Sequence, residues 1–130
     1  MKAFFDTNVL LYAASEDPRQ AKADELLRRG GVISVQVLNE FANVSLVKLR
    51  LDWPSIETAL TRFCDAFEEI VPLTLATHAA AVGLARDHRV AFYDALIVAA
   101  AREAGCDTLF TEDMQDSRRF GDLAIVNPFK

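Results

Sequence analysis

Residues 2–12 have the sequence Lys2-Ala3-Phe4-Phe5-Asp6-Thr7-Asn8-Val9-Leu10-Leu11-Tyr12, in which a short apolar run ends on a carboxylate. A run that is short and apolar throughout is typical of a strand buried on both faces, as in a parallel sheet. In open α/β sheets the ligand crevice lies beyond the carboxyl ends of the strands. Asp6 is therefore expected at such a crevice. The simpler alternative is that Asp6 only caps a short helix over residues 9–12.

The rest of the chain alternates strand-like and helix-like segments. Short apolar runs at 32–35, 69–73, 108–111 and 124–127 predict further strands. Apolar residues at three- to four-residue spacing predict helices between them, with starts at Asp17-Pro18, about Val35, Asp52-Trp53-Pro54, Thr74 and Tyr93. This alternation predicts an α/β fold in which helices cover both faces of a parallel sheet. We expect a three-layer α/β/α sandwich with a central parallel sheet of four or five strands.

Length and composition restrict the class of protein. The 130 residues suit one domain, 1–130, with a single core. The net charge of −5 excludes a basic footprint over the whole protein, so nucleic-acid binding would need a local basic patch or metal ions. With no signal peptide and no membrane-spanning run, we expect a cytoplasmic protein without membrane contact. Cys64 and Cys106 lack metal-ligand spacing and are expected to be reduced, mostly buried thiols.

Three further acidic residues occupy places related to that of Asp6. Asp113 follows the apolar run at 108–111, and Asp94 opens the most apolar helix, where the helix dipole favours negative charge. Glu40 lies about one turn into the helix after the second strand, beside its apolar face. Each could be a cap, a turn residue or a solvated flank. Those interpretations do not explain why all the acids follow strands of one sheet or lie near the starts of the helices that cover it.

Such a group of carboxylates predicts a metal site. Repulsion between clustered carboxylates is costly without a cation, and oxygen ligands suit Mg²⁺ or Mn²⁺. Ions of this kind commonly serve in the hydrolysis of phosphate esters. Thr7, Asn8 and Thr111 are placed to orient the carboxylates or a water molecule by hydrogen bonds. The residues by themselves therefore predict a Mg²⁺-dependent phosphoesterase.

Four segments together resemble a PIN domain: Phe5-Asp6-Thr7-Asn8-Val9-Leu10, the helix with Glu40, Tyr93-Asp94-Ala95-Leu96-Ile97-Val98-Ala99-Ala100-Ala101, and Leu109-Phe110-Thr111-Glu112-Asp113. The resemblance covers essentially the whole chain and is closest to VapC-type ribonuclease toxins of bacterial type II toxin–antitoxin systems. It implies an α/β/α sandwich, a Mg²⁺-dependent endoribonuclease that hydrolyses RNA phosphodiester bonds, a homodimer and a cognate antitoxin. The family's catalytic and metal-binding acids correspond to Asp6, Glu40, Asp94 and Asp113. Asp116 is close enough in sequence to share or replace the role of Asp113.

Charge predicts how a partner would inhibit such an enzyme. An acidic protein with an acid-lined crevice attracts arginine, whose guanidinium group can pair bidentately with carboxylates. We therefore expect an antitoxin with a basic tail that displaces or excludes the metal ion. Arg28-Arg29, Lys48, Arg50 and Arg118-Arg119 are interpreted as surface charge, part of which is placed to line an RNA path.

Three alternatives stay open at the level of sequence. One is a PIN-type RNA-processing nuclease without an antitoxin. Another is a haloacid-dehalogenase-like phosphatase with Asp6 as nucleophile, but that family needs a second acid where this chain has Asn8. The third is a non-enzymatic, Mg²⁺-binding receiver-like module, whose paired acids and lysine after the last strand are not found.

Overall fold

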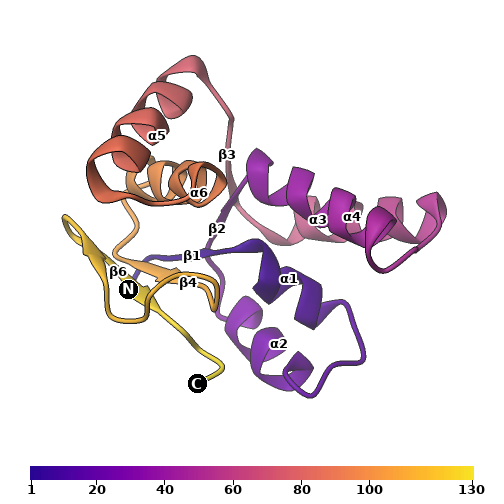
Figure 1. The fold of residues 1–130 in the computed structure, drawn as a ribbon. Coiled ribbons are helices and arrows are strands. Elements are labelled where there is room, and N and C mark those ends of the chain that lie inside the picture. The colour runs from indigo at the N-terminus through magenta and orange to yellow at the C-terminus, as the bar shows by residue number, and fades with distance from the viewer.

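The computed structural model describes residues 1–130 and has a central sheet with helices packed around it (Figure 1). The strands are β1 (Ala3–Phe5), β2 (Val32–Ser34), β3 (Glu69–Val71), β4 (Thr108–Phe110), β5 (Arg119–Phe120) and β6 (Leu123–Val126). The helices are α1 (Thr7–Ala13), α2 (Gln20–Arg28), α3 (Val35–Val47), α4 (Trp53–Ala66), α5 (Leu75–His88) and α6 (Phe92–Glu103).

The order of the strands places a crevice beside β1. The sheet has the order β3-β2-β1-β4-β6-β5, so the chain moves outward from β1 to β3 and then returns to the opposite side of β1. All pairs except β5–β6 are parallel. The winding direction therefore reverses between β1 and β4, and a ligand crevice is expected beyond the carboxyl ends of these two strands.

The predicted α/β architecture is confirmed, with one more strand than expected. The additional strand, β5, contains only Arg119 and Phe120 and pairs antiparallel with β6. Gly121 makes the tight turn between them with a φ of +61°, a conformation that costs glycine little. Two residues are too few to show strand alternation, which is why the sequence pattern did not indicate β5.

Helices lie on both sides of the sheet. Figure 1 shows α5 and α6 on one side and α1 and α2 on the other, while α3 and α4 form a pair that extends away from it. The core contains 29 buried hydrophobic residues, including all of β1 and the run from Ala95 to Ala101 in α6. The expectation that α6 is apolar on all sides because it is buried is therefore confirmed.

The starts of α3, α4, α5 and α6 agree with the sequence pattern to within one residue, whereas the start of α2 differs. Asp52 caps α4 by accepting a hydrogen bond from Ser55 N, and Thr74 forms a capping box with Thr77. The predicted cap at Asp17 is wrong, because α2 begins only at Gln20. The Asp17 carboxylate accepts from Arg19 N at 2.8 Å, and its carbonyl oxygen accepts from Gln20 N. Residues 17–20 therefore form a turn in place of a first helical turn.

The two cysteines differ in exposure. Both are free thiols, but only Cys106 is buried, so the expectation of mostly buried thiols is right for Cys106 and wrong for Cys64. Cys64 lies on α4, in which Ile56 is the only fully buried residue because the α3–α4 pair projects from the sheet. None of the helices combines the length and apolar character that crossing a membrane requires.

Candidate active site

Asp6 lies at the carboxyl end of β1, next to the carboxyl end of β4, where the strand order predicts a crevice. The residue is only 3% exposed, and it occupies the N-cap position of α1. Its Oδ1 accepts a hydrogen bond from Thr7 N, and its Oδ2 accepts one from the Thr111 hydroxyl, each at 2.7 Å. Both carboxylate oxygens are therefore held by neutral donors. Asp6 caps α1, as the simpler interpretation held, and it also faces other acids.

Thr7 connects Asp6 with Glu40. The Thr7 hydroxyl donates a 2.7 Å hydrogen bond to Glu40 Oε2, while its backbone N–H donates to Asp6. Glu40 projects from α3, which begins directly after β2 and is capped by Ser34. The partner that the sequence did not reveal for Glu40 is therefore a hydroxyl supplied by the first residue of α1.

Thr111 and Asn8 connect Asp6 with Asp113. The Thr111 oxygen that donates to Asp6 also accepts from Asp113 N at 3.1 Å and from Asn8 Nδ2 at 3.3 Å. Asn8 Nδ2 also donates to Asp113 Oδ2 at 3.0 Å. These contacts orient the Asp113 carboxylate towards β1. Asn8 Oδ1 is buried and has no hydrogen-bond partner, so the crevice contains one oxygen that lacks a donor or a cation.

Burial and neighbouring negative charges disfavour ionisation of Asp6 and Asp94. Burial is the main cause that raises the pKa of Asp6 to about 7; Thr111 and Thr7 oppose the shift, and Glu40 and Asp113 add to it. Asp94, on the first turn of α6, has no hydrogen-bond partner. Its pKa is raised first by burial and then by the charges of Asp113 and Glu40. The acids of four separate segments therefore influence one another electrostatically.

Asp116 lies outside this group. Its Oδ1 accepts from Asn127 N at 2.8 Å, and its Oδ2 accepts from Lys130 Nζ at 3.1 Å. These contacts hold the pKa of Asp116 below its usual value. The Asp116 side chain therefore ties the loop after β4 to the C-terminal segment, and Asp113 is the acid of this loop that faces the crevice.

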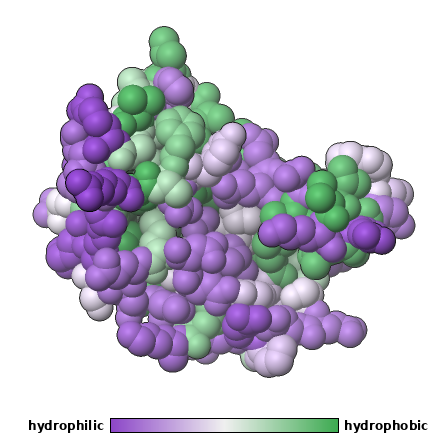
Figure 2. Space-filling model, viewed as in Figure 1, coloured by the Kyte–Doolittle hydropathy of each residue, from purple (hydrophilic) through white to green (hydrophobic).

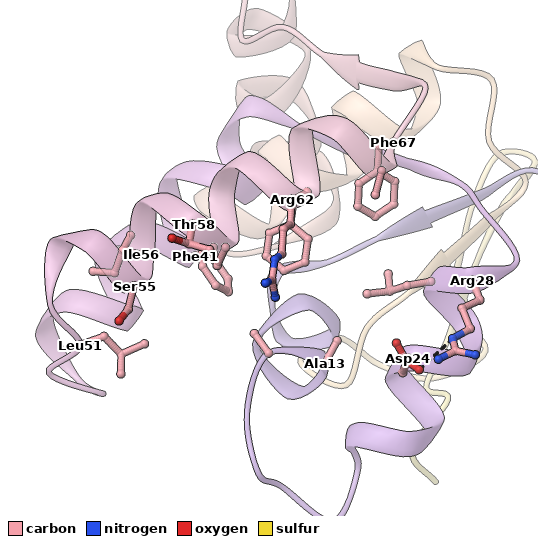
Figure 3. Close-up of a pocket in the computed structure, with 15 residues that line it drawn as sticks. Ala13, Asp24, Arg28, Phe41, Leu51, Ser55, Ile56, Thr58, Arg62 and Phe67 are labelled. Atoms are coloured by element: carbon pink, nitrogen blue, oxygen red, sulfur yellow. Dashed lines mark ion pairs between the residues drawn. The ribbon is translucent and has the colours of Figure 1, made fainter.

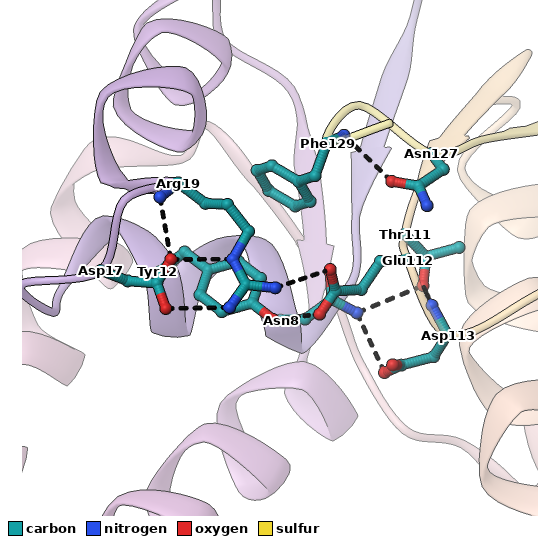
Figure 4. Close-up of polar contacts among 9 residues, drawn as sticks. All are labelled: Asn8, Tyr12, Asp17, Arg19, Thr111, Glu112, Asp113, Asn127 and Phe129. Atoms are coloured by element: carbon teal, nitrogen blue, oxygen red, sulfur yellow. Dashed lines mark hydrogen bonds and ion pairs between the residues drawn. The ribbon is translucent and has the colours of Figure 1, made fainter.

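A cluster around Tyr12 supports the loop that carries Asp113 (Figure 4). The Arg19 guanidinium group lies 3.9 Å from the centre of the Tyr12 ring and pairs with Asp17 and Glu112. The Tyr12 hydroxyl donates to Glu112, the residue next to Asp113. Phe129 packs edge-on against Tyr12, with 5.1 Å between the ring centres. These contacts join α1, the loop before α2 and the C-terminal segment at one side of the site.

The donor set suits a hard divalent cation. The acids offer carboxylate oxygens, and Asn8 adds a buried amide oxygen without a hydrogen-bond partner. Both atom types are ligands that a hard cation prefers. No three acidic, histidine or cysteine side chains converge as a ready ligand group in this structure. The acids are therefore neighbours whose chemistry fits a cation, although their side chains do not form a closed ligand shell.

A second hollow lies between α1, α2 and α4 (Figure 3). Its lining is mostly apolar and includes Phe41, Phe63 and Phe67, and the charged residues Asp24, Arg28 and Arg62 also line it. Arg28 is paired with Asp24 at 2.9 Å. This surface, which we call the α1–α4 groove, is distinct from the acidic crevice but shares α1 and α3 with it.

The PIN domain family model matches residues 3–122, a range that contains all four acids. The chain belongs to the PIN domain family. No curated protein matches the sequence significantly. The family assignment agrees with the resemblance that the sequence motifs carried.

Solved structures with the same PIN fold include toxins of toxin–antitoxin systems. Mycobacterium tuberculosis VapC20, a sarcin–ricin-loop-cleaving toxin, is 20% identical, with 86% of this chain and 92% of that chain covered and a TM-score of 0.72. A toxin–antitoxin complex from Klebsiella pneumoniae is 22% identical, with 99% of each chain covered and a TM-score of 0.74. VapBC2 from Rickettsia felis, bound to a promoter DNA fragment, is 22% identical, with 96% and 97% covered and a TM-score of 0.69. These likenesses show that the whole chain shares the fold of VapC proteins.

Proposed function

We propose that this PIN domain protein is a metal-dependent endoribonuclease and the toxin of a toxin–antitoxin pair. The observation that carries the proposal is the position of Asp6, which is held by Thr7 and Thr111 at the carboxyl ends of β1 and β4. The charges of Glu40 and Asp113, from two other segments, add to the raised pKa of Asp6 and also raise the pKa of Asp94. This arrangement suits a cation and a phosphodiester substrate better than it suits a purely structural helix cap.

Each acid has a proposed role. Asp6, Asp94 and Asp113 would hold Mg²⁺ or Mn²⁺, and closing the ligand shell would require movement of the exposed Asp113 or the half-buried Asp94. When bound, a divalent cation activates water and offsets the charge that develops on the phosphate group. Glu40, fixed by the Thr7 hydroxyl, would bind the cation or orient the attacking water. Thr7, Asn8 and Thr111 keep these carboxylates in place.

The direct test is cleavage of single-stranded RNA by the purified protein. We expect cleavage with Mg²⁺ or Mn²⁺ and none in EDTA, because the site offers oxygen ligands without histidine or thiol ligands. Asp94→Asn, purified in the same way, controls for contaminating nuclease. Undiminished cleavage in chelator by wild-type protein, with an inactive Asp94→Asn sample, would contradict the metal mechanism.

The proposed partner is an antitoxin with a basic tail. The Klebsiella and Rickettsia neighbours are toxin–antitoxin complexes, and the α1–α4 groove offers this chain an apolar surface close to the acidic crevice. We propose that an apolar segment of the antitoxin occupies the groove and that an arginine of its tail pairs with the acids. Removing the tail should therefore restore RNA cleavage while complex formation persists. Equal inhibition without the tail would contradict this mechanism.

A homodimer is the proposed form of the free protein. Figure 2 shows hydrophobic side chains over α5 and α6, where Leu75 is 82% and Tyr93 63% exposed. Exposed apolar side chains of this kind favour association between copies. Light scattering of wild-type protein and of Leu75→Glu tests the proposal, with a dimer expected only for the wild type. A monomeric wild-type protein at working concentration would contradict it.

A further inference from the structure

A small pocket is lined by two of the acids and by two arginines. It has a volume of about 180 Å³ and lies between the loop before α6, the loop after β4 and the short strand β5. Asp94 and Arg89 line it from the segment at the start of α6, and Asp113 and Arg118 line it from the loop after β4. The size suits a phosphate group with part of its sugar.

Arg118 is held in position by contacts that leave most of its donors free. Its Nη2 donates a 2.7 Å hydrogen bond to the carbonyl oxygen of His88, and its guanidinium carbon lies 4.7 Å from the centre of the Phe120 ring. The His88 ring packs against the same phenylalanine, with 5.5 Å between the centres. Arg118 makes no ion pair, so its charge and four further N–H donors are available to an anion.

Arg89 lines the pocket from the segment between α5 and α6. It is the C-cap residue of α5 and has a left-handed backbone conformation, with φ of +55°. Its side chain is exposed and has no ion pair, whereas the nearby Arg86 is paired with Asp87 at 2.7 Å. The hydrogen bond from Arg118 to His88 O joins the two arginine-bearing segments directly.

We propose that Arg89 and Arg118 bind a backbone phosphate of the RNA next to the bond that is cleaved. The proposal rests on the proposed ribonuclease function. With a net charge of −5, the protein needs a local basic patch or bound metal ions to attract RNA, and this pair of arginines adjoins two of the acids that would act on the substrate. The arginines supply positive charge in the same pocket that two of the carboxylates line.

The variants are chosen to remove charge without disturbing the fold. Arg89→Asn places in the left-handed position a residue that tolerates it, and Arg118→Gln keeps an N–H donor for His88 O. The matched controls are Arg86→Gln, three residues before Arg89, and Arg119→Gln, next to Arg118. Each removes one positive charge from a residue that does not line the pocket. Arg118→Lys retains the charge. Thermal melting of each variant checks that it is folded.

The measurement is the binding of a fluorescein-labelled 20-nucleotide single-stranded RNA, by anisotropy, in Ca²⁺ at several salt concentrations. A gel checks that the RNA stays intact. We expect Arg89→Asn and Arg118→Gln each to weaken binding about tenfold, which corresponds to a lost charge-assisted hydrogen bond. Each should also reduce the slope of log K against log salt by about 0.7. The two controls should bind within about twofold of wild type, and Arg118→Lys should bind better than Arg118→Gln.

Several outcomes would overturn the proposal. The proposal fails if the pocket variants and the control variants weaken RNA binding equally, or if only one of the two pocket variants weakens it. It also fails if the wild-type protein binds no RNA. Pocket-specific loss of binding in a protein that cleaves no RNA with Mg²⁺ or Mn²⁺ would instead contradict the proposed nuclease function and leave the phosphate site standing.

Discussion

The hydroxyl of Thr111 donates a 2.7 Å hydrogen bond to Oδ2 of Asp6, although the two residues are 105 positions apart. The register of the sheet produces this contact. Phe5 pairs with Phe110 in the parallel strands β1 and β4, so the next residue of each strand emerges at the same edge. Because the bond favours the ionised form of a buried carboxylate, Thr111 opposes the effect of burial on the pKa of Asp6.

Replacing Thr111 by valine should remove the hydrogen bond that favours the ionised form of Asp6. Thr111→Val keeps the shape of the side chain but leaves Asp6 Oδ2 without its donor and Asp113 N without its acceptor. We expect the protein to lose about 1–3 kcal/mol of stability at pH 8, and RNA cleavage to fall. Urea unfolding and a cleavage assay measure the two effects.

Thr108→Val is the matched control, because Thr108 lies on the same strand and its hydroxyl donates only to Asp107 at the surface. It should change stability and cleavage little. If Thr111→Val behaved like Thr108→Val, the hydrogen bond to Asp6 would have no functional importance.

Replacing Asp94 by asparagine should separate activity from stability. Asp94 makes no hydrogen bond, and its pKa is raised by burial and by neighbouring acids, so its charge disfavours the metal-free fold. Asp94→Asn should lose most activity yet unfold at the same or a higher temperature in EDTA, with a gain on the order of 1 kcal/mol. Mg²⁺ should raise the melting temperature of the wild type more than that of the variant. A clearly destabilised variant that still cleaves RNA would identify Asp94 as a helix-start charge only.

Asp6 should make the metal-free protein less stable as pH rises. In the unfolded chain this carboxyl group loses its proton near the ordinary value of 3.8, whereas the folded protein retains it up to about pH 7. Between these values the native state binds more protons, so the free energy of unfolding falls with increasing pH, by up to about 1.4 kcal/mol per unit. Asp6→Asn should lack this contribution. Urea unfolding in EDTA at pH 4.5, 5.5 and 6.5 measures the free energy of unfolding of both proteins. The value for Asp6→Asn should rise relative to that of the wild type as pH increases, and a difference that is constant with pH would refute the prediction.

Asp113 and Asp116 should respond differently to the same substitution. Asp113→Asn removes a charge that faces the crevice and should abolish most RNA cleavage. Asp116→Asn should retain cleavage but lower stability, because the ionised carboxylate accepts from Asn127 N and pairs with Lys130. The sign follows from the lowered pKa of Asp116, since the ionised form is favoured in the folded state. Loss of cleavage in Asp116→Asn without loss of stability would transfer the proposed role to Asp116.

The sequence alone determined the features that depend on local periodicity. The apolar runs that end at Asp6 and just before Asp113 predicted strands with acids at their carboxyl ends, and the structure has β1 and β4 there. The nearly continuous apolar segment from Ala95 predicted a buried helix, which α6 is. Burial requires the same side-chain pattern wherever an element packs, so these predictions needed no knowledge of the partners.

Only the tertiary structure decided which side chains meet. It separated Asp113 from Asp116, because the loop after β4 turns Asp113 towards Asn8 and Asp116 towards the C-terminal segment. It supplied Glu40 with the hydroxyl of Thr7, and it brought Arg89, which no sequence pattern had marked, to the same pocket as Arg118. Contacts between residues far apart in the chain depend on strand order, register and loop paths, and a local pattern contains none of these.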